Sequence, residues 1–222
     1  MSDTLELLAF DIETTGFDAD DVVTVVGFRL PLGCQVFCQT DGRTSDDVEA
    51  TLQGKLDEHV NVALHESEAA LLEAVAEFVQ MRLRDDDVLL TAFNGETWDG
   101  GFDLPFLRTR FAAHGLDWPF VDVPYADVFP VVQKLFNTTI NGESRSGLVT
   151  AYDVLCDGEF GEIDPFEDSA EAVTAFENGR FTALVAHNVA DVLRTAALGE
   201  LAEQYCSKSD FQVKSLTPTS HG

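Results

Sequence analysis

Basic residues are scarce in this 222-residue chain, where 13 Lys and Arg stand against 40 Asp and Glu for a net charge of −27. Lysine occurs only as Lys55, Lys134, Lys208 and Lys214. Taken alone, this balance argues against a nucleic-acid partner, because binding DNA or RNA usually rests on neutralising phosphates.

The acidic residues are nevertheless scattered along the chain. The groups at 20–21, 46–47, 85–87 and 159–171 are typical of solvated loops and helix ends. Abundant acid with little lysine is typical of a protein from a salt-rich cytoplasm. Because the Debye length is only about 3 Å in 1 M salt, such a surface would hardly repel a polyanion at a distance. The charge therefore indicates habitat more than partner.

Long hydrophobic runs and cysteine motifs are also lacking. No stretch approaches the ~18 uninterrupted apolar residues of a membrane span, and the opening MSDTLE is too acidic for a secretory signal. We therefore expect a cytoplasmic protein without a membrane partner. Cys34, Cys38, Cys156 and Cys206 form no Cys-x-x-Cys pair, which predicts buried thiols rather than a zinc site or disulfides. Neither a Gly-x-Gly-x-x-Gly nor a P-loop element occurs, which weakens any dinucleotide or P-loop interpretation.

The apolar residues present, 45% of the chain with 17 Phe, suffice for the core of one sizeable domain. Their spacing predicts strands over 5–11, 22–30, 34–39, 88–93 and 121–128, and helices over 66–83, 103–114, 129–136, 148–156, 169–178 and 181–205. This order predicts an α/β fold whose mixed sheet combines a three-stranded antiparallel meander with parallel strands, flanked by helices. We expect one domain over 1–206, a flexible tail over 207–222 and a mobile loop over 141–147.

Two carboxylates end the first predicted strand, in the segment AFDIETTG. Since alternate side chains of a strand share a face, Asp11 and Glu13 emerge together, about 7 Å apart along it. Two acids at the end of a core strand gain nothing structural, and they repel each other unless a cation lies between them. Mg²⁺ takes oxygen ligands of this kind, so the pair indicates a divalent-cation site.

Two later segments supply further candidates. Asp103 opens a predicted helix directly after a strand, although an Asp there could serve only as the helix N-cap. In LVAHNVADVLRTAAL, His187 and Asp191 are four residues apart and therefore stack on one helix face. That face is nearly opposite the most apolar stripe, so the pair could be merely solvated. With carboxylates in all three segments, we favour a shared functional role.

Together the three segments resemble the motifs of the DEDD superfamily of 3′-to-5′ exonucleases, most closely the proofreading domain of family B DNA polymerases and its stand-alone relatives. FDIETTG matches the first motif. Asn94-Gly95 followed by Phe102-Asp103-Leu104-Pro105 matches the second, and HNVAD the third, with His187 in the general-base position. The motifs come in the family's order, and the resemblance spans roughly residues 5 to 205. It implies a ribonuclease-H-like fold.

The sequence departs from the family pattern twice. Relatives with Tyr at the base position place it four residues before the last Asp, whereas those with His usually place it five before; here His187 has the tyrosine-type spacing. The second motif also carries the extra residues ETWDG, which leaves Asp99 as a competitor of Asp103 for the ligand role.

The resemblance implies hydrolysis of phosphodiester bonds at the 3′ end of DNA or RNA with two Mg²⁺ or Mn²⁺ ions. Asp11, Glu13, Asp103 and Asp191 would hold the ions, and His187 would accept the proton of the attacking water. The substrate would be a nucleic acid with a free 3′ end, single-stranded for preference. Its expected contacts are Thr14, Thr15, Gly16, Asn94, Phe102 and Arg108, with Trp98 or Phe106 as further stacking residues and Arg110, Arg145 and Lys134 as further phosphate contacts.

Two alternatives stay open. A haloacid-dehalogenase-like phosphatase has a strand ending Asp-x-Asp-x-Thr, but here Glu13 replaces the second Asp and no later Lys and Asp-Asp pair completes that pattern. A non-catalytic nucleic-acid-binding relative is the other alternative, and intact acids in all three motifs speak against it. The sequence does not decide between DNA and RNA, nor the pathway, the protein partners or the oligomeric state.

Overall fold

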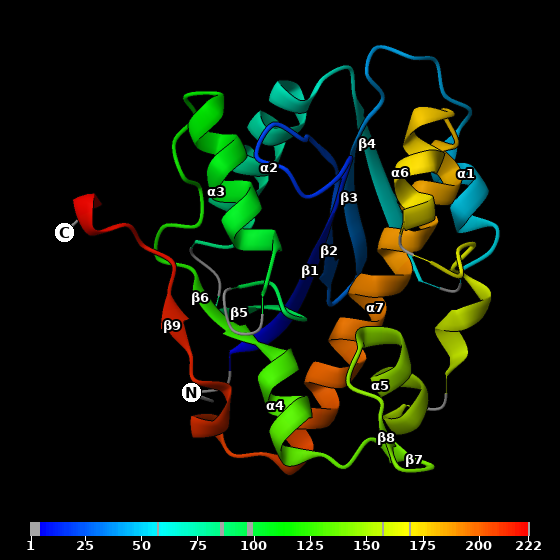
Figure 1. The fold of residues 1–222 in the computed structure, drawn as a ribbon. Helices are drawn as coiled ribbons and strands as arrows, with labels where there is room; N and C mark the ends of the chain where they lie inside the picture. The colour runs from blue at the N-terminus through cyan, green and yellow to red at the C-terminus, as the bar shows by residue number, and fades with distance from the viewer. Residues whose placement is uncertain are drawn as a thin grey trace.

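A computed structural model describes residues 5–56, 58–84, 87–96, 100–156, 158–168 and 170–221. Its main feature is a seven-stranded sheet in the order β4-β3-β2-β1-β5-β6-β9 (Figure 1). The strands are β1 (Glu6–Thr14), β2 (Val23–Leu30), β3 (Gly33–Gln39), β4 (Val60–His65), β5 (Val88–Ala92), β6 (Pro124–Asp127) and β9 (Lys214–Ser215). Strands β1, β2 and β3 form an antiparallel meander, whereas β5 and β6 continue from β1 in parallel. The expected α/β fold with a mixed sheet is confirmed.

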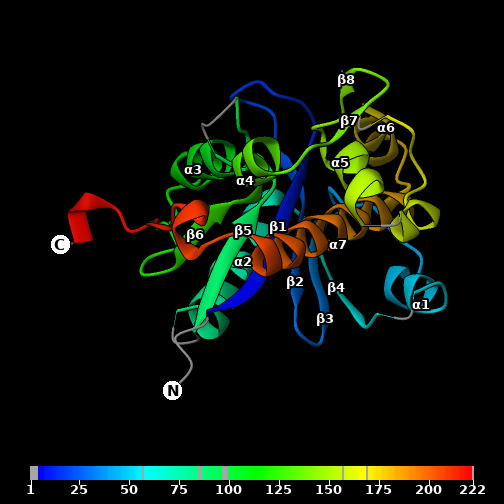
Figure 2. The ribbon, with the colours of Figure 1, turned by 90° about the horizontal axis from the view of Figure 1, so that it is seen from below.

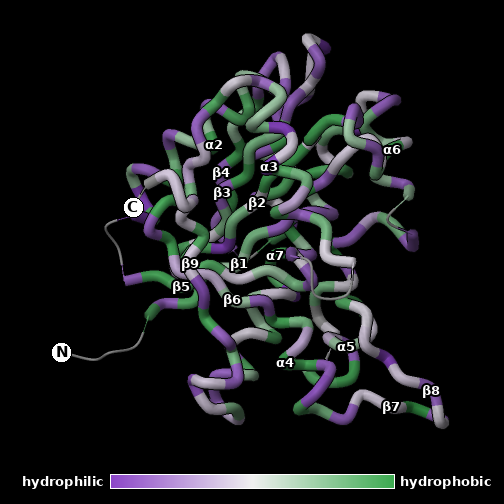
Figure 3. Tube along the Cα trace, turned by 60° about the vertical axis from the view of Figure 1, so that its left-hand side comes forward, coloured by the Kyte–Doolittle hydropathy of each residue, from purple (hydrophilic) through white to green (hydrophobic). Residues whose placement is uncertain are grey.

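Helices cover both faces of this sheet (Figures 1 and 2). On one face lie α2 (Glu68–Arg82) and α3 (Asp103–Ala113). The other is crossed by the long α7 (Phe181–Tyr205), around which pack α1 (Val48–Gln53), α4 (Val128–Leu135), α5 (Leu148–Leu155) and α6 (Ala170–Glu177). Short elements complete the chain: the hairpin of β7 (Thr139–Ile140) and β8 (Glu143–Ser144), and the 3₁₀ turns Glu159–Glu162, Lys208–Phe211 and Thr219–His221. Figure 3 shows hydrophobic segments gathered in the sheet and hydrophilic ones toward the outside.

The alternation of side chains along β1 decides what each face receives. Leu8, Phe10 and Ile12 are buried in the core formed with α2 and α3. Asp11 and Glu13, at the intervening positions, therefore face α7 on the opposite side. Their partners on β2 are Gly27 and Val25.

Helix α7 runs close to the sheet at Gly27, where the β2 backbone has no side chain to keep the helix away. A Cβ at this position would overlap the Oδ1 atom of Asn188. Glycine is the residue that permits such an approach. The close approach brings the polar face of α7 directly over the end of β1.

Most predicted elements are present with boundaries shifted by a few residues. The prediction of a helix over 181–205 agrees with α7, and Ser67 caps α2 by accepting a hydrogen bond from the Ala70 amide. Helix α1 and strand β4 were not predicted. Helix α1 has only six residues, and β4 is a partly exposed edge strand, so neither shows a clear apolar period.

The C-terminal segment, for which we expect a flexible tail, carries a short strand and two buried side chains. Residues 214–215 form β9, which pairs antiparallel with β6, and Phe211 and Leu216 are buried. Trp118 also donates a hydrogen bond from Nε1 to the Leu216 carbonyl, at 3.1 Å. Burial of Phe211 and Leu216 thus holds the segment against the domain, although most of its residues are polar. The loop expected to be mobile at 141–147 likewise contributes to the β7–β8 hairpin.

The four cysteines, all within the described residues, form no disulfide. Cys34 and Cys38 are buried as predicted, and burial raises the pKa of each thiol to about 12. Cys156 and Cys206 are only partly buried. Within the described part of the chain, no helix combines the length and apolar character needed to cross a membrane.

Candidate active site

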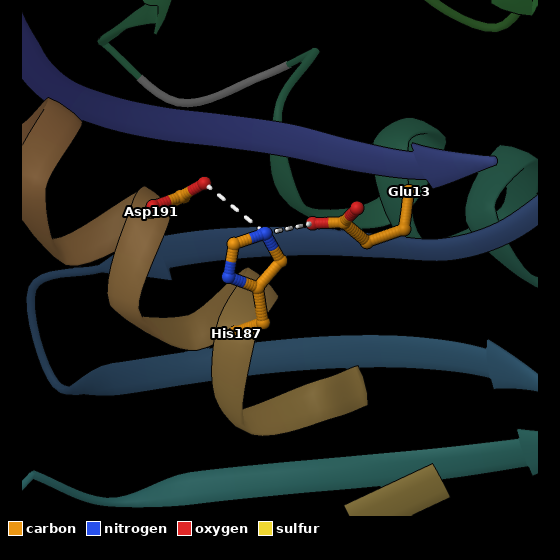
Figure 4. A group of neighbouring side chains, drawn as sticks. All are labelled: Glu13, His187 and Asp191. Carbon is orange, nitrogen blue, oxygen red and sulfur yellow. Dashed lines mark ion pairs between the residues drawn. The ribbon is translucent and has the colours of Figure 1, made fainter. Parts of the chain in front are cut away.

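Glu13 of β1 and His187 and Asp191 of α7 point toward one another (Figure 4). The Nε2 atom of His187 lies 3.8 Å from Glu13 Oε1 and 3.8 Å from Asp191 Oδ2. One ligand atom from each residue lies within 4.8 Å of the other two, an arrangement that could hold a metal ion. The strand alternation of β1 and the four-residue spacing on α7 together produce this geometry.

Asp11 and Asp103 are the other two predicted acids, and we refer to Asp11, Glu13, Asp103 and Asp191 together as the acidic centre. The pKa of the Asp11 carboxyl is raised well above its usual value, first by burial and then by repulsion from Asp103, Glu13 and Asp191. The pKa of Asp103 is raised in the same way, with burial first and then repulsion from Asp127, Glu13 and Asp191. The four predicted acids come from β1, α3 and α7, and their charges act on one another, whereas the group with metal-binding spacing among the described residues is Glu13, His187 and Asp191.

Asp103 does not act as a helix cap. Helix α3 has Phe102 at its N-cap position, without a capping hydrogen bond from a side chain. Asp103 occupies the first helical position and is only 8% exposed. The N-cap role considered for this residue is therefore wrong.

Burial dominates the electrostatics of Glu13 and His187. It raises the pKa of Glu13 to about 8, and the attraction of His187 offsets part of this rise. The pKa of His187 rises to about 9, because the hydrogen bond to Asp164 and the charges of Glu13 and Asp191 outweigh the opposing effect of burial. Near neutral pH the metal-free site therefore retains protons.

Two residues that sequence reasoning missed hold the α7 side of this centre. Asp164 Oδ1 lies 2.8 Å from His187 Nδ1, and Asp164 Oδ2 accepts a hydrogen bond from Arg194 at 2.6 Å. The same Arg194 nitrogen donates to Asp191 Oδ1 at 2.6 Å. Asp164 belongs to the acidic stretch expected to be solvated, but its side chain is only 6% exposed, so that expectation is wrong here.

The alternative of a merely solvated His187–Asp191 pair is also wrong. His187 is 5% exposed and Arg194 only 2%, because the segment around Asp164 covers this face of α7. The ring of Phe166 packs 5.2 Å from that of His187. Nothing in the local apolar pattern of α7 signals this cover, since it comes from a distant part of the chain.

Asn188 and Asp127 are two further polar residues beside the acids. Asn188 donates from Nδ2 to the carbonyl of Asp11 at 3.2 Å and to its carboxylate at 2.9 Å. Asp127, at the end of β6, accepts hydrogen bonds from the amides of Asn94 and Phe129. Asp127 could have been predicted near the site from the sequence, because it ends a strand that lies parallel to and beside β5.

The turn after β1 is held by hydrogen bonds from the side chains of Thr14 and Thr15, and Gly16 lies within it. The Thr14 hydroxyl donates to the Gly16 carbonyl at 2.7 Å, and that of Thr15 donates to Asp21 at 2.9 Å. A Cβ at Gly16 would overlap the Asp21 carboxylate, so a larger residue there would displace this side chain from its bond with Thr15. This turn directly follows Asp11 and Glu13 in the chain. Its contact with a substrate stays a prediction.

Asn94 and Phe102 flank the acidic centre from the second motif. Asn94 adopts a left-handed conformation with φ of 62°, and its buried Oδ1 finds no hydrogen-bond partner within the described residues. The Phe102 ring packs 5.1 Å from Phe17 and 4.8 Å from Phe106. Phe17, which is 85% exposed, leaves an aromatic surface open to solvent beside the end of β1.

The basic residues expected to contact phosphate have different surroundings. Arg108 pairs with Glu96 at 2.9 Å, and Lys214 reaches the same carboxylate. Arg110 is buried against Glu68 at 2.7 Å, which assigns it a structural role. Arg145 pairs with Glu143 on the β7–β8 hairpin, and Lys134 lies in the last turn of α4. Trp98 and Asp99 lie outside the described residues.

A comparison with models of known protein families finds no match to this chain, and a comparison with curated proteins finds none either. The interpretation of the acidic centre therefore depends on its own residues and geometry.

Proposed function

We propose that the protein is a metal-dependent 3′-to-5′ exonuclease with a ribonuclease-H-like fold, acting on DNA or RNA. The observation that supports this best is the group of Glu13, His187 and Asp191, with Asp11 and Asp103 close enough for their charges to act on it. A cluster of this kind is costly to bury unless a cation neutralises it. We also propose that the protein works in a salt-rich cytoplasm.

The donor set fits divalent ions. Carboxylate oxygens are the ligands that Mg²⁺ and Mn²⁺ prefer, and the four acids supply them from three elements. Burial and mutual repulsion raise the pKa values of these acids, so a bound cation would relieve an unfavourable arrangement. Asp11, Glu13, Asp103 and Asp191 would hold two such ions.

When bound, two divalent ions supply an activated water and charge stabilisation at the leaving 3′ oxygen. The chain's own residues do the rest. His187 presents Nε2 toward Glu13 and Asp191, where it would take up a proton. Phe102 and the turn at 14–16 would contact the base and sugar of a terminal nucleotide, since stacking on aromatic rings tolerates any base.

The acidic surface sets a condition on this reaction. With a net charge of −27, long-range repulsion would oppose a polyanion at low ionic strength. In molar salt this repulsion is screened within about 3 Å. We therefore expect activity in concentrated KCl, and a loss of activity on dilution into low salt.

The decisive experiment incubates 5′-labelled single-stranded DNA and RNA with the purified protein in 2 M KCl and Mn²⁺ or Mg²⁺. A ladder of strands shortened from the 3′ end is expected, and a strand blocked at its 3′ end should resist. Asp11→Asn should abolish trimming, whereas Asp117→Asn, an equal charge change at an exposed residue, should leave it intact.

Each alternative has its own signature in the same assay. Phosphate release from small monoesters without trimming would favour a phosphatase. Metal-dependent strand binding without any cleavage would favour a non-catalytic relative. Either result would overturn the proposed exonuclease.

A further inference from the structure

A chain of short charged contacts joins three residues of α7 to one residue outside it. Asp164 contacts His187 Nδ1 through one carboxylate oxygen, at 2.8 Å, and Arg194 through the other, at 2.6 Å. Arg194 in turn donates to Asp191 at 2.6 Å. His187, Asp191 and Arg194 are spaced by four and three residues, so they occupy one face of the helix.

We propose that Asp164 is a positioning residue, which orients the His187 imidazole directly and the Asp191 carboxylate through Arg194. The inference rests on the proposed function of the acidic centre, and it assigns a role to a residue outside all three motifs. Asp164 would touch neither substrate nor metal ion.

The geometry supports orientation rather than simple contact. An imidazole has two nitrogens, and the bond made by one determines where the other points. With Nδ1 held by Asp164, Nε2 is directed between Glu13 and Asp191, at 3.8 Å from each. The Phe166 ring packs against the imidazole and restrains it further.

Burial makes these contacts strong. The side chain of Asp164 is 6% exposed and that of Arg194 is 3% exposed, so water competes little for their hydrogen bonds. The Phe166 amide also donates to Asp164 Oδ1 at 3.1 Å, which fixes the carboxylate within its own turn. Asp164 is therefore held from both sides and can act as a rigid acceptor.

This anchor also bears on the unusual spacing of His187. Four residues before Asp191, the imidazole stacks directly on the acid along the helix, and its ring would otherwise be free to turn about the Cβ–Cγ bond. A turned ring would present carbon in place of Nε2. Asp164 is the group in the described structure that selects the orientation with Nε2 facing the acids.

The competing interpretation is a purely structural ion pair that fastens the 158–168 segment to α7. That interpretation predicts a loss of stability and nothing specific to the His187 ring. Asp164→Asn separates the two. Its amide keeps the shape but has one acceptor oxygen, so it can serve His187 or Arg194 and not both. Glu167→Gln is the matched control, since it removes the same charge from an exposed residue of the same segment.

In the nuclease assay, Asp164→Asn should lower kcat by about 10- to 100-fold, the usual effect of losing a group that orients a catalytic side chain, with KM changed less than about twofold. Glu167→Gln should match the unmodified protein in both constants. A wild-type kcat in folded Asp164→Asn would overturn the inference, as would a change confined to melting temperature.

A second readout needs neither activity nor metal. In ¹H–¹⁵N spectra of the metal-free protein, the His187 Nδ1 proton should resonate downfield and exchange slowly with water, and Asp164→Ala, which removes both acceptor oxygens, should abolish both properties. Fast exchange in the unmodified protein would overturn the inference, even if Asp164→Ala does not fold. Absence of trimming by the unmodified protein would instead contradict the proposed function, while the His187 spectra still decide the role of Asp164.

Discussion

The individual acids of the centre are held in an unfavourable state. Glu13 and Asp103 are buried and Asp11 is partly buried, and desolvation is the first cause of the raised pKa of each. Only part of this charge is offset from the described residues, by His187 and by Arg194. Residues arranged against their own stability are typical of functional sites.

This arrangement predicts that the metal-free protein loses stability as pH rises. The folded pKa of Glu13 is about 8 against an ordinary 4.5, and that of His187 is about 9 against 6.5. Both groups bind more protons in the folded than in the unfolded state, so the free energy of unfolding falls with pH. The His187 contribution is complete below pH 6.5 and is lost as pH rises through 9. Calorimetry in chelator should show a melting temperature that decreases from pH 6.5 to 9, by roughly 2–4 °C for each 1 kcal/mol lost.

The same melting temperatures should be measured with Mn²⁺ in place of chelator. Because an ion replaces protons at carboxylates, its addition should release protons and flatten the pH dependence of the melting temperature. Asp11→Asn should weaken both effects. A metal-free melting temperature that is constant from pH 6.5 to 9 would contradict the electrostatic account.

At the scale of elements, the contact between α7 and the sheet holds the site together. Asp11 lies opposite Gly27 on the neighbouring strand, and Asn188 of α7 bonds both the carbonyl and the carboxylate of Asp11. The distance of α7 from β2 thus determines the position of Asp11. Gly27 lies outside the three motifs, yet it contributes to the geometry of the site.

Gly27→Ala should therefore damage both stability and activity. The added Cβ would overlap Asn188 Oδ1 and contact Val192 Cγ1, so either the buried Asn188 side chain, which bonds Asp11, or α7 itself must shift. Overpacking of this kind costs about 1–3 kcal/mol, which denaturant unfolding would measure. Gly161→Ala is the control, because its Cβ would meet nothing within 4 Å. Equal stabilities for the two variants would show that the close approach at Gly27 does not matter.

The last strand gives a second prediction at this scale. Truncation after Cys206 removes β9 together with the buried side chains of Phe211 and Leu216, and it uncovers the edge of β6. Burial of these two side chains is worth about 3 kcal/mol or more, which should appear in urea unfolding. Truncation after Thr217 keeps these contacts and should cost much less. Equal stability of both truncations would restore the interpretation of a dispensable tail.

For the whole molecule, the net charge of −27 dominates the expected behaviour. Self-repulsion destabilises a folded protein of this charge, and salt screens it over a Debye length of about 10 Å at 0.1 M and 3 Å at 1 M. Ion pairs at the surface offset little of this repulsion, because exposed pairs are weak.

We accordingly predict that KCl stabilises the protein. A rise from 0.1 to 2 M should add about 2 kcal/mol, which corresponds to roughly 4–8 °C in melting temperature for a chain of this length. Sucrose of equal osmolality is the control, since it acts by exclusion from the surface without screening charge. A melting temperature that responds equally to sucrose and KCl would contradict the role assigned to charge.

The sequence by itself determined the features that depend on neighbouring residues. The alternation along β1 put Asp11 and Glu13 on one face, the spacing in α7 stacked His187 on Asp191, and Ser67 marked the start of α2. Each follows from the repeat of a strand or helix, which a short segment already contains. The mixed sheet followed from the order of these elements.

Only the tertiary structure decided which distant groups meet. Asp164 looked like one of many solvated acids, yet it lies against His187 and Arg194 because the segment that carries it folds over α7. Leu216 is buried because β9 pairs with β6, although the residues around it are polar. Burial and long-range pairing depend on the whole chain, so no local pattern reveals them.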